Sequence, residues 1–72
     1  MSHSTGTEYG KFQLEDGMEF HWMVNWDSRK PEVYGHVQTR TGRILKGYSG
    51  WYRTHDPENA LAIVRFKMGD QG

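Results

Sequence analysis

The segment from Met18 to Trp26 alternates between large apolar and polar side chains, and this alternation is the strongest structural signal in the chain. Read with a period of two, one side carries Met18, Phe20, Trp22, Val24 and Trp26, and the other carries Glu19, His21, Met23 and Asn25. The pattern predicts a half-buried β-strand. Because each large apolar side chain taken out of water stabilises a fold by about 1.5–3 kcal/mol, this segment supplies the largest block of the expected core.

The segment that precedes it predicts a second strand, paired antiparallel with the first. It ends at Glu15-Asp16-Gly17, where the glycine suits the left-handed position of a three-residue hairpin loop. That loop sets Phe12 opposite Phe20 and Gly10 opposite Trp22. We therefore expect the first strand to cover the central one through aromatic contacts.

Two more strands follow a polar turn that contains Pro31. Residues 33–39 alternate again, and Arg40-Thr41-Gly42 has the composition of a second three-residue loop. The chain from Arg43 to Arg53 then predicts a long strand, in which Gly47 and Gly50 indicate a bend or bulge. Together these segments predict a four-stranded antiparallel meander.

The length of the second loop determines which side chains of the fourth strand point into the core. A three-residue loop pairs Val37 with Leu45, His36 with Lys46, and Tyr34 with Tyr48. It also turns Trp51 towards the core, together with Leu45. A two-residue loop would move every side chain of this strand to the other face. We prefer the three-residue loop because it leaves Lys46 in solvent.

The last element has two interpretations. Asp56 can cap a helix that begins with Pro57 and ends at Gly69, and on that helix one stripe holds Ala60, Leu61, Ile63, Val64 and Met68. The alternative is a turn followed by a fifth strand over residues 60–68. We expect the helix, because a sheet with one apolar face needs a layer over that face. The predicted fold is α+β, a four-stranded antiparallel meander with a C-terminal helix; the alternative is an all-β five-stranded sheet or small barrel.

Composition limits the domain organisation and the compartment. The chain has 72 residues and no cysteine, and 9 basic residues balance 9 acidic residues. We expect one small domain over residues 8–69, with tails at 1–7 and 70–72, and no disulfide or thiolate metal site. A cytosolic setting, in a bacterium or a host cell, fits the lack of cysteine. The longest apolar run, residues 60–64, is too short to cross a membrane.

Catalytic and metal chemistry find little support in the sequence. His21 and His36 fall on one outward face, diagonal to each other in the expected register, but no third ligand at a suitable spacing accompanies them. A serine could be combined with His55 and Asp56, yet residues adjacent in a turn do not normally form such a hydrogen-bonded chain. We expect no enzymatic activity, no cofactor and no metal site.

The outward face of the sheet is the candidate functional surface. It is rich in tyrosine and methionine and edged by basic residues, a composition typical of protein-binding surfaces. The expected binding residues are Met23, Tyr34, His36, Arg40, Lys46, Tyr48 and Tyr52. We predict a non-catalytic protein-binding module, and its small size fits an inhibitor or adaptor of the kind found in phages and mobile elements.

Two alternatives use the same face. Exposed aromatic rings beside basic residues also bind single-stranded nucleic acid, although the neutral net charge counts against strong phosphate binding. An exposed sheet face or edge can also make the protein a homodimer.

Overall fold

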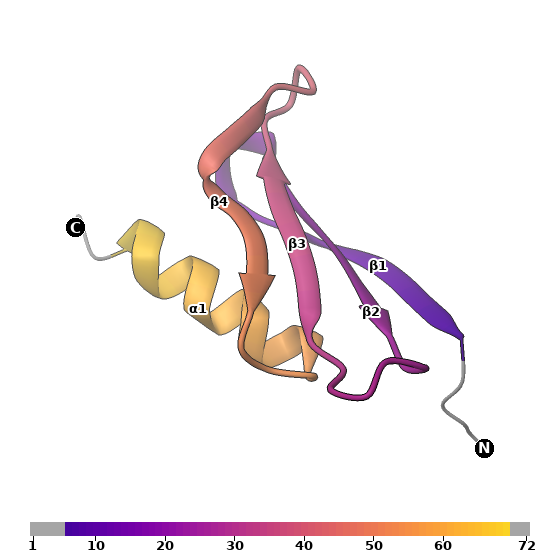
Figure 1. Cartoon of the computed structure of the whole chain (residues 1–72). Coiled ribbons are helices and arrows are strands. Elements are labelled where there is room, and N and C mark those ends of the chain that lie inside the picture. Colours follow the sequence, from indigo (N-terminus) through magenta and orange to yellow (C-terminus); the bar gives the residue numbers. More distant parts are fainter. Residues whose placement is uncertain (1–5, 70–72) are drawn as a thin grey trace.

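The computed structural model describes residues 6–69, and within them a four-stranded antiparallel sheet in the order β1-β2-β3-β4 is followed by one α-helix. The elements are β1 (Thr7–Gln13), a short 3-10 turn η1 (Glu15–Gly17), β2 (Glu19–Asn25), β3 (Val33–Gln38), β4 (Ile44–Tyr52) and α1 (Pro57–Gly69). Figure 1 shows α1 lying across one face of the twisted sheet, with β1 at the opposite edge from β4. The predicted α+β meander is confirmed, and the five-stranded alternative is wrong.

The ends of the predicted domain can be compared only in part. Thr7, expected in the N-terminal tail, is the first residue of β1. Gly6, also expected in that tail, is described, and its carbonyl accepts a hydrogen bond from the Trp26 N–H at 2.8 Å. The remaining tail residues, 1–5 and 70–72, lie outside the described residues.

Strands β1, β2 and β3 form a regular ladder with the predicted faces. Phe12 pairs with Phe20, Gly10 pairs with Trp22, and Phe20 also pairs with Val37. The predicted loop between β1 and β2 is confirmed: Gly17 has φ 77°, and the Leu14 N–H donates to the Met18 carbonyl at 2.8 Å. Asp16 also has a positive φ, of 62°. Since the ladder is unbroken, alternation along the sequence is alternation between the two faces.

The β3–β4 ladder contains a large bulge. The predicted loop is present, because the Thr39 N–H donates to the Arg43 carbonyl, and Val37 pairs with Leu45 as expected. The next pair, however, is Gly35 with Gly50. One residue of β3 therefore faces the four residues 46–49 of β4, three more than a regular ladder allows. The glycines correctly indicated a bulge.

Because three is an odd number, the bulge exchanges the two faces of β4 beyond it. Tyr52 pairs with Val33 and is buried, with 5% of its surface exposed, whereas Trp51 pairs with Tyr34 and is 65% exposed. The predictions that Trp51 lies in the core and Tyr52 on the outward face were therefore wrong, and so was the pairing of Tyr34 with Tyr48.

The core lies between the inner face of the sheet and α1. Its buried side chains are Phe20, Val24, Val33, Val37, Tyr52, Ala60 and Val64. The ring of Tyr52 meets Phe20 edge-on at 5.6 Å, and its hydroxyl donates to the Tyr48 carbonyl within the bulge. The side chain that the bulge brings inwards is thus held by both packing and a hydrogen bond.

Helix α1 begins as predicted, and four residues of its expected stripe pack on the core, but Ile63 is 37% exposed and the prediction for it was wrong. The Asp56 carboxylate accepts a hydrogen bond from the Glu58 N–H at 3.0 Å, which caps the first turn. Ala60 and Val64 are buried, while Phe66 lies off the stripe and is 73% exposed. In residues 6–69, no helix is both long enough and apolar enough to cross a membrane.

Candidate functional site

The face of the sheet that points away from α1 is the candidate site, and it is called the open face below. The cross-strand pairs place one residue from each strand side by side on it: Tyr9, Met23, Tyr34 and Trp51. We call these four residues the aromatic row. The row depends on the regular pairing of β1 with β2 and of β2 with β3, and on the pairing of β3 with the part of β4 that follows the bulge.

The aromatic row is well exposed. The exposed fractions are 72% for Tyr9, 41% for Tyr34 and 65% for Trp51. The rings of Tyr34 and Trp51 contact each other edge-on, with centroids 4.9 Å apart and planes at 63°. Contacts of this kind hold aromatic side chains in place before a partner arrives, which lowers the entropic cost of binding. The row therefore offers a partly ordered apolar surface that α1 does not cover.

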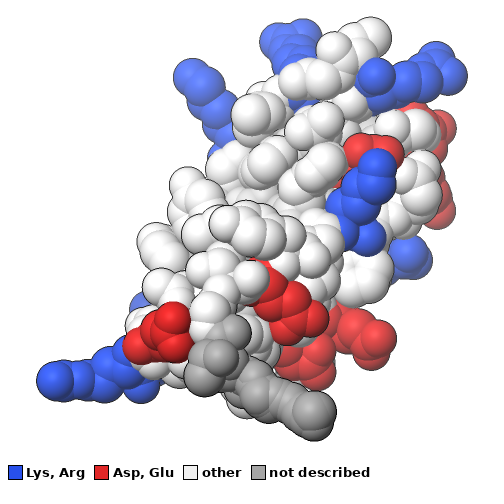
Figure 2. Space-filling view, turned by 90° about the vertical axis from the view of Figure 1, so that its right-hand side faces the viewer, with Lys and Arg blue, Asp and Glu red and all other residues white. Residues whose placement is uncertain are grey.

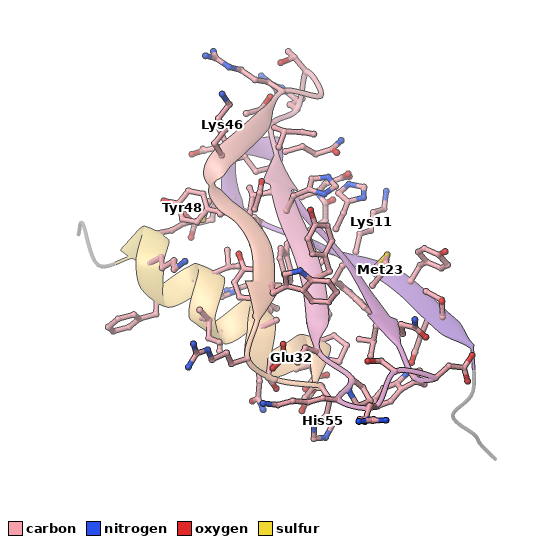
Figure 3. All side chains as sticks on the ribbon, viewed as in Figure 1. Lys11, Met23, Glu32, Lys46, Tyr48 and His55 are labelled. Carbon is pink, nitrogen blue, oxygen red and sulfur yellow. The ribbon has the colours of Figure 1, made fainter. Side chains whose placement is uncertain are left out.

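A second row of polar side chains runs beside the first. Lys11, His21 and His36 are paired across β1, β2 and β3. The imidazole rings of His21 and His36 stack, with centroids 5.2 Å apart and planes at 2°. The two histidines therefore lie directly opposite each other, and the diagonal arrangement expected from the sequence was wrong. Figure 3 shows that Lys11 and Met23, one residue from each row, lie on the same side of the sheet.

Hydrogen bonds along the strands fix the histidine rings. His21 Nε2 lies 2.9 Å from Glu19 Oε1, and His36 Nε2 lies 3.1 Å from Gln38 Oε1. The hydrogen bond from His21 holds the pKa of the Glu19 carboxyl below its usual value, partly opposed by desolvation, and Lys11 at 3.4 Å acts in the same direction as His21. Lys11, the full cation of the second row, thus pairs with the neighbouring Glu19 carboxylate, so the centre of the open face is close to neutral.

The structure distributes the sequence-predicted binding residues over several regions. Met23, Tyr34 and His36 lie together on the open face. Lys46 lies within the bulge, towards the hairpin end of β4, and Arg40 lies in the loop between β3 and β4; both are exposed. Neither belongs to the aromatic row.

Tyr48 and Tyr52 do not lie on the open face, which corrects the prediction for both. Tyr52 is in the core. Tyr48 is half-buried, packs against the core and points towards the α1 side of β4 (Figure 3). It lines a hollow of about 350 Å³ whose walls also include Leu14, Met18 and Met68. The physical reason is the bulge, which redirects the side chains of residues 46–49 and exchanges the faces beyond them.

Sequence reasoning missed Tyr9, Lys11 and Trp51 as members of this face. Tyr9 and Lys11 could have been found, because the predicted pairing of Gly10 and Phe12 already placed the odd-numbered residues of β1 outwards. Trp51 could not, because two glycines indicate a bulge without giving its length. The exposed ring of Trp51 therefore appears only in the structure.

Within residues 6–69, no three His, Asp or Glu side chains are placed so that they could hold a metal ion. Comparison with known proteins gave no match among protein-family models, curated proteins or solved structures. The open face is therefore assessed from its own chemistry.

Proposed function

We propose that this protein is a non-catalytic binding module whose open face binds another protein. The observation that carries this proposal is the aromatic row, in which three exposed rings and Met23 extend across all four strands on the face that α1 leaves uncovered. Aromatic residues and methionine are enriched at protein interfaces, and large rigid rings contribute contact area at a low entropic cost.

The polar row fits the same function. In a protein interface an apolar centre is bordered by polar groups whose hydrogen bonds are satisfied. Here His21, His36 and Glu19 already have hydrogen-bond partners within the chain, so a partner can cover them at a reduced desolvation cost. We propose Met23, Tyr34, His36, Tyr9 and Trp51 as the binding residues, with Arg40 and Lys46 contributing at the margin.

The small size of the domain also fits an inhibitor or adaptor, and the cysteine-free sequence fits a cytosolic setting. The inhibitor or adaptor role and the cytosolic setting are both part of the proposal, and identification of the partner would test them.

The test is to recover the partner from source cells with the tagged chain, before and after nuclease treatment, and then to measure its affinity for two single-site variants. Trp51→Ala should weaken the complex by more than ~2 kcal/mol, because a few large aromatic residues, tryptophan above all, carry most of the energy of a typical interface. Phe66→Ala is the matched control, since Phe66 is similarly exposed, at 73% against 65% for Trp51, but lies on α1. Equal losses for both variants would remove the open face as the binding site.

Single-stranded nucleic acid is the second candidate, favoured by one observation: the aromatic row lies directly beside Lys11, His21 and His36. Bases stack on exposed rings while cations follow the phosphates. In that case the recovered partner would disappear after nuclease treatment. Its affinity would also fall steeply with rising salt concentration.

A further inference from the structure

The two edges of the sheet differ in whether they can accept another strand. At one edge, β4 is interrupted by the bulge over residues 46–49, and Gly50 has a φ of 134°. Bulges of this kind prevent a further strand from pairing along an edge. At the other edge, β1 pairs with β2 through all seven of its residues without a shift in register. Among the described strands, β1 therefore presents the regular free edge.

The backbone groups available at this edge can be identified from the ladder. The Trp26 N–H donates to the Gly6 carbonyl and the Leu14 N–H donates to the Met18 carbonyl, each at 2.8 Å. Hydrogen-bonded pairs alternate along an antiparallel ladder, so the even-numbered residues of β1 point their N–H and C=O groups at β2. The N–H and C=O groups of the odd-numbered residues point outwards: Thr7, Tyr9, Lys11 and Gln13.

We propose that β1 pairs antiparallel with β1 of a second copy of this chain, across a two-fold axis that passes beside Gly10. This register pairs Tyr9 with Lys11 of the second copy and Thr7 with its Gln13. Both residues of each pair are odd-numbered, and the odd-numbered residues are the ones whose backbone groups point outwards. Every outward N–H and C=O group of β1 therefore finds a hydrogen-bond partner on the second copy. The result is one continuous eight-stranded sheet.

The side chains favour this register over its neighbours. Moving the axis to Lys11 would place the two Lys11 side chains opposite each other, and like charges directly opposite are destabilising. Moving it to Tyr9 would leave Gln13 without a partner residue within the strand. In the proposed register each Lys11 instead lies beside a Tyr9 ring, and on the other face Glu8 lies opposite Phe12, so no like charges meet.

The charge of the molecule and the surface of this edge agree with a second copy as the occupant. The chain carries no net charge, so two copies do not repel each other at long range. Figure 2 looks at the β1 side of the molecule and shows a band of uncharged atoms across its middle, bordered by basic and acidic side chains. Pairing here leaves the open face accessible and brings two aromatic rows together on one side of the sheet.

The test is the mass of the purified chain in solution, measured by sedimentation equilibrium over a wide range of concentration. The wild type should rise from 8.4 kDa to twice that mass. Lys11→Pro removes one outward N–H without removing a β1–β2 hydrogen bond, and should keep the mass at that of the monomer. Lys11→Ala retains the N–H and is the matched control, which should still form dimers.

A second measurement tests the register and does not depend on the proline variant folding. The chain has no cysteine, so introduced thiols are unique. A mixture of Tyr9→Cys and Lys11→Cys chains should form a disulfide faster than either variant alone. A wild type that stays monomeric, a Lys11→Pro chain that still forms dimers, or a Tyr9→Cys chain that cross-links with itself as fast as the mixture would each overturn the proposal. These results involve no other protein, so they are separate from the test of the open face.

Discussion

Side chains alternate between the two faces of the sheet in β1, β2 and β3 and also in β4, but only in β4 does the alternation change face within the strand. In the first region every residue has one cross-strand partner, so an apolar side chain two positions from another lies on the same face. In β4 the segment between Leu45 and Gly50 contains three residues more than a regular ladder would hold. Beyond this segment, the side chains that would have pointed to one face point to the other. The comparison shows that hydrophobic alternation identifies a buried face only while the ladder is continuous.

The largest expected effect contrasts one aromatic side chain from each region. Phe20→Ala should unfold the domain or nearly so, because truncating a fully buried phenylalanine costs about 3–5 kcal/mol and small domains have a total stability of about 5 kcal/mol. Trp51→Ala removes a larger ring but one that is 65% exposed, and should leave the melting temperature almost unchanged. Thermal unfolding followed by circular dichroism measures both. A cooperative, stable Phe20→Ala variant would place the core elsewhere.

The next effect concerns a glycine of the regular region. A Cβ at Gly35 would lie 2.7 and 2.8 Å from two Phe20 ring atoms and 2.9 Å from the His21 carbonyl oxygen, and the latter belongs to the backbone and cannot move aside. Gly35→Ala should therefore destabilise the protein by about 1–3 kcal/mol, as overpacked cores do. Urea unfolding would measure the change, and an unaltered midpoint would show that β2 and β3 are farther apart than described.

A smaller effect tests the hydrogen bond that ties the bulge to the core. Tyr52→Phe keeps the ring against Phe20 but loses the bond to the Tyr48 carbonyl, which should cost about 1 kcal/mol near neutral pH. Chemical denaturation would measure this difference. A variant as stable as the wild type would mean that the bulge holds its shape without this bond.

The same hydroxyl should make stability depend on pH. Burial raises the pKa of Tyr52 above its ordinary value of 10.0, and the nearby Tyr48 adds to the rise. Above pH 10 the unfolded chain loses this proton before the folded chain does, so stability falls as the pH rises through that range. Tyr52→Phe has no such proton, so the difference in melting temperature between the two proteins should narrow above pH 10. A constant difference would contradict the burial of this hydroxyl.

The smallest effect belongs to a glycine of the bulge. A Cβ at Gly47 would meet no atom within 4 Å, and its backbone does not adopt a positive φ. Gly47→Ala should change stability by less than about 0.5 kcal/mol, as ordinary surface substitutions do. Gly50, with a φ of 134°, is the sensitive neighbour, and its alanine variant should cost about 1–3 kcal/mol. Equal responses at these two positions would show that the bulge is not built as described.

Most of the fold could be predicted from the sequence because its signals are local. Period-two alternation identified β2, the glycines of two loops fixed the hairpins, and Asp56 with Pro57 marked the start of α1. The orientation of β4 beyond its bulge is not a local property. It depends on how many residues lie outside the ladder, and the burial of Tyr52 against Phe20 is decided by packing between distant strands.

The candidate site follows the same division. Met23, Tyr34 and His36 come from the regular strands and were predicted on the correct face. Tyr48 and Tyr52 come from β4 and were assigned to the wrong one, while Trp51 was assigned to the core. The aromatic row therefore combines residues that the sequence predicts with one that only the three-dimensional pairing reveals.

The three tryptophans differ in their access to solvent, and this gives the protein an internal optical reporter. Trp22 lies over Gly10 with its indole N–H buried and without a hydrogen-bond partner in the described residues, whereas Trp51 is largely exposed on the open face. A collisional quencher such as iodide should reach Trp51 first, and a partner bound to the aromatic row should shield it. Binding at the open face would then be visible as lost quenching in an unlabelled protein, with Trp51→Phe as the variant in which that signal disappears.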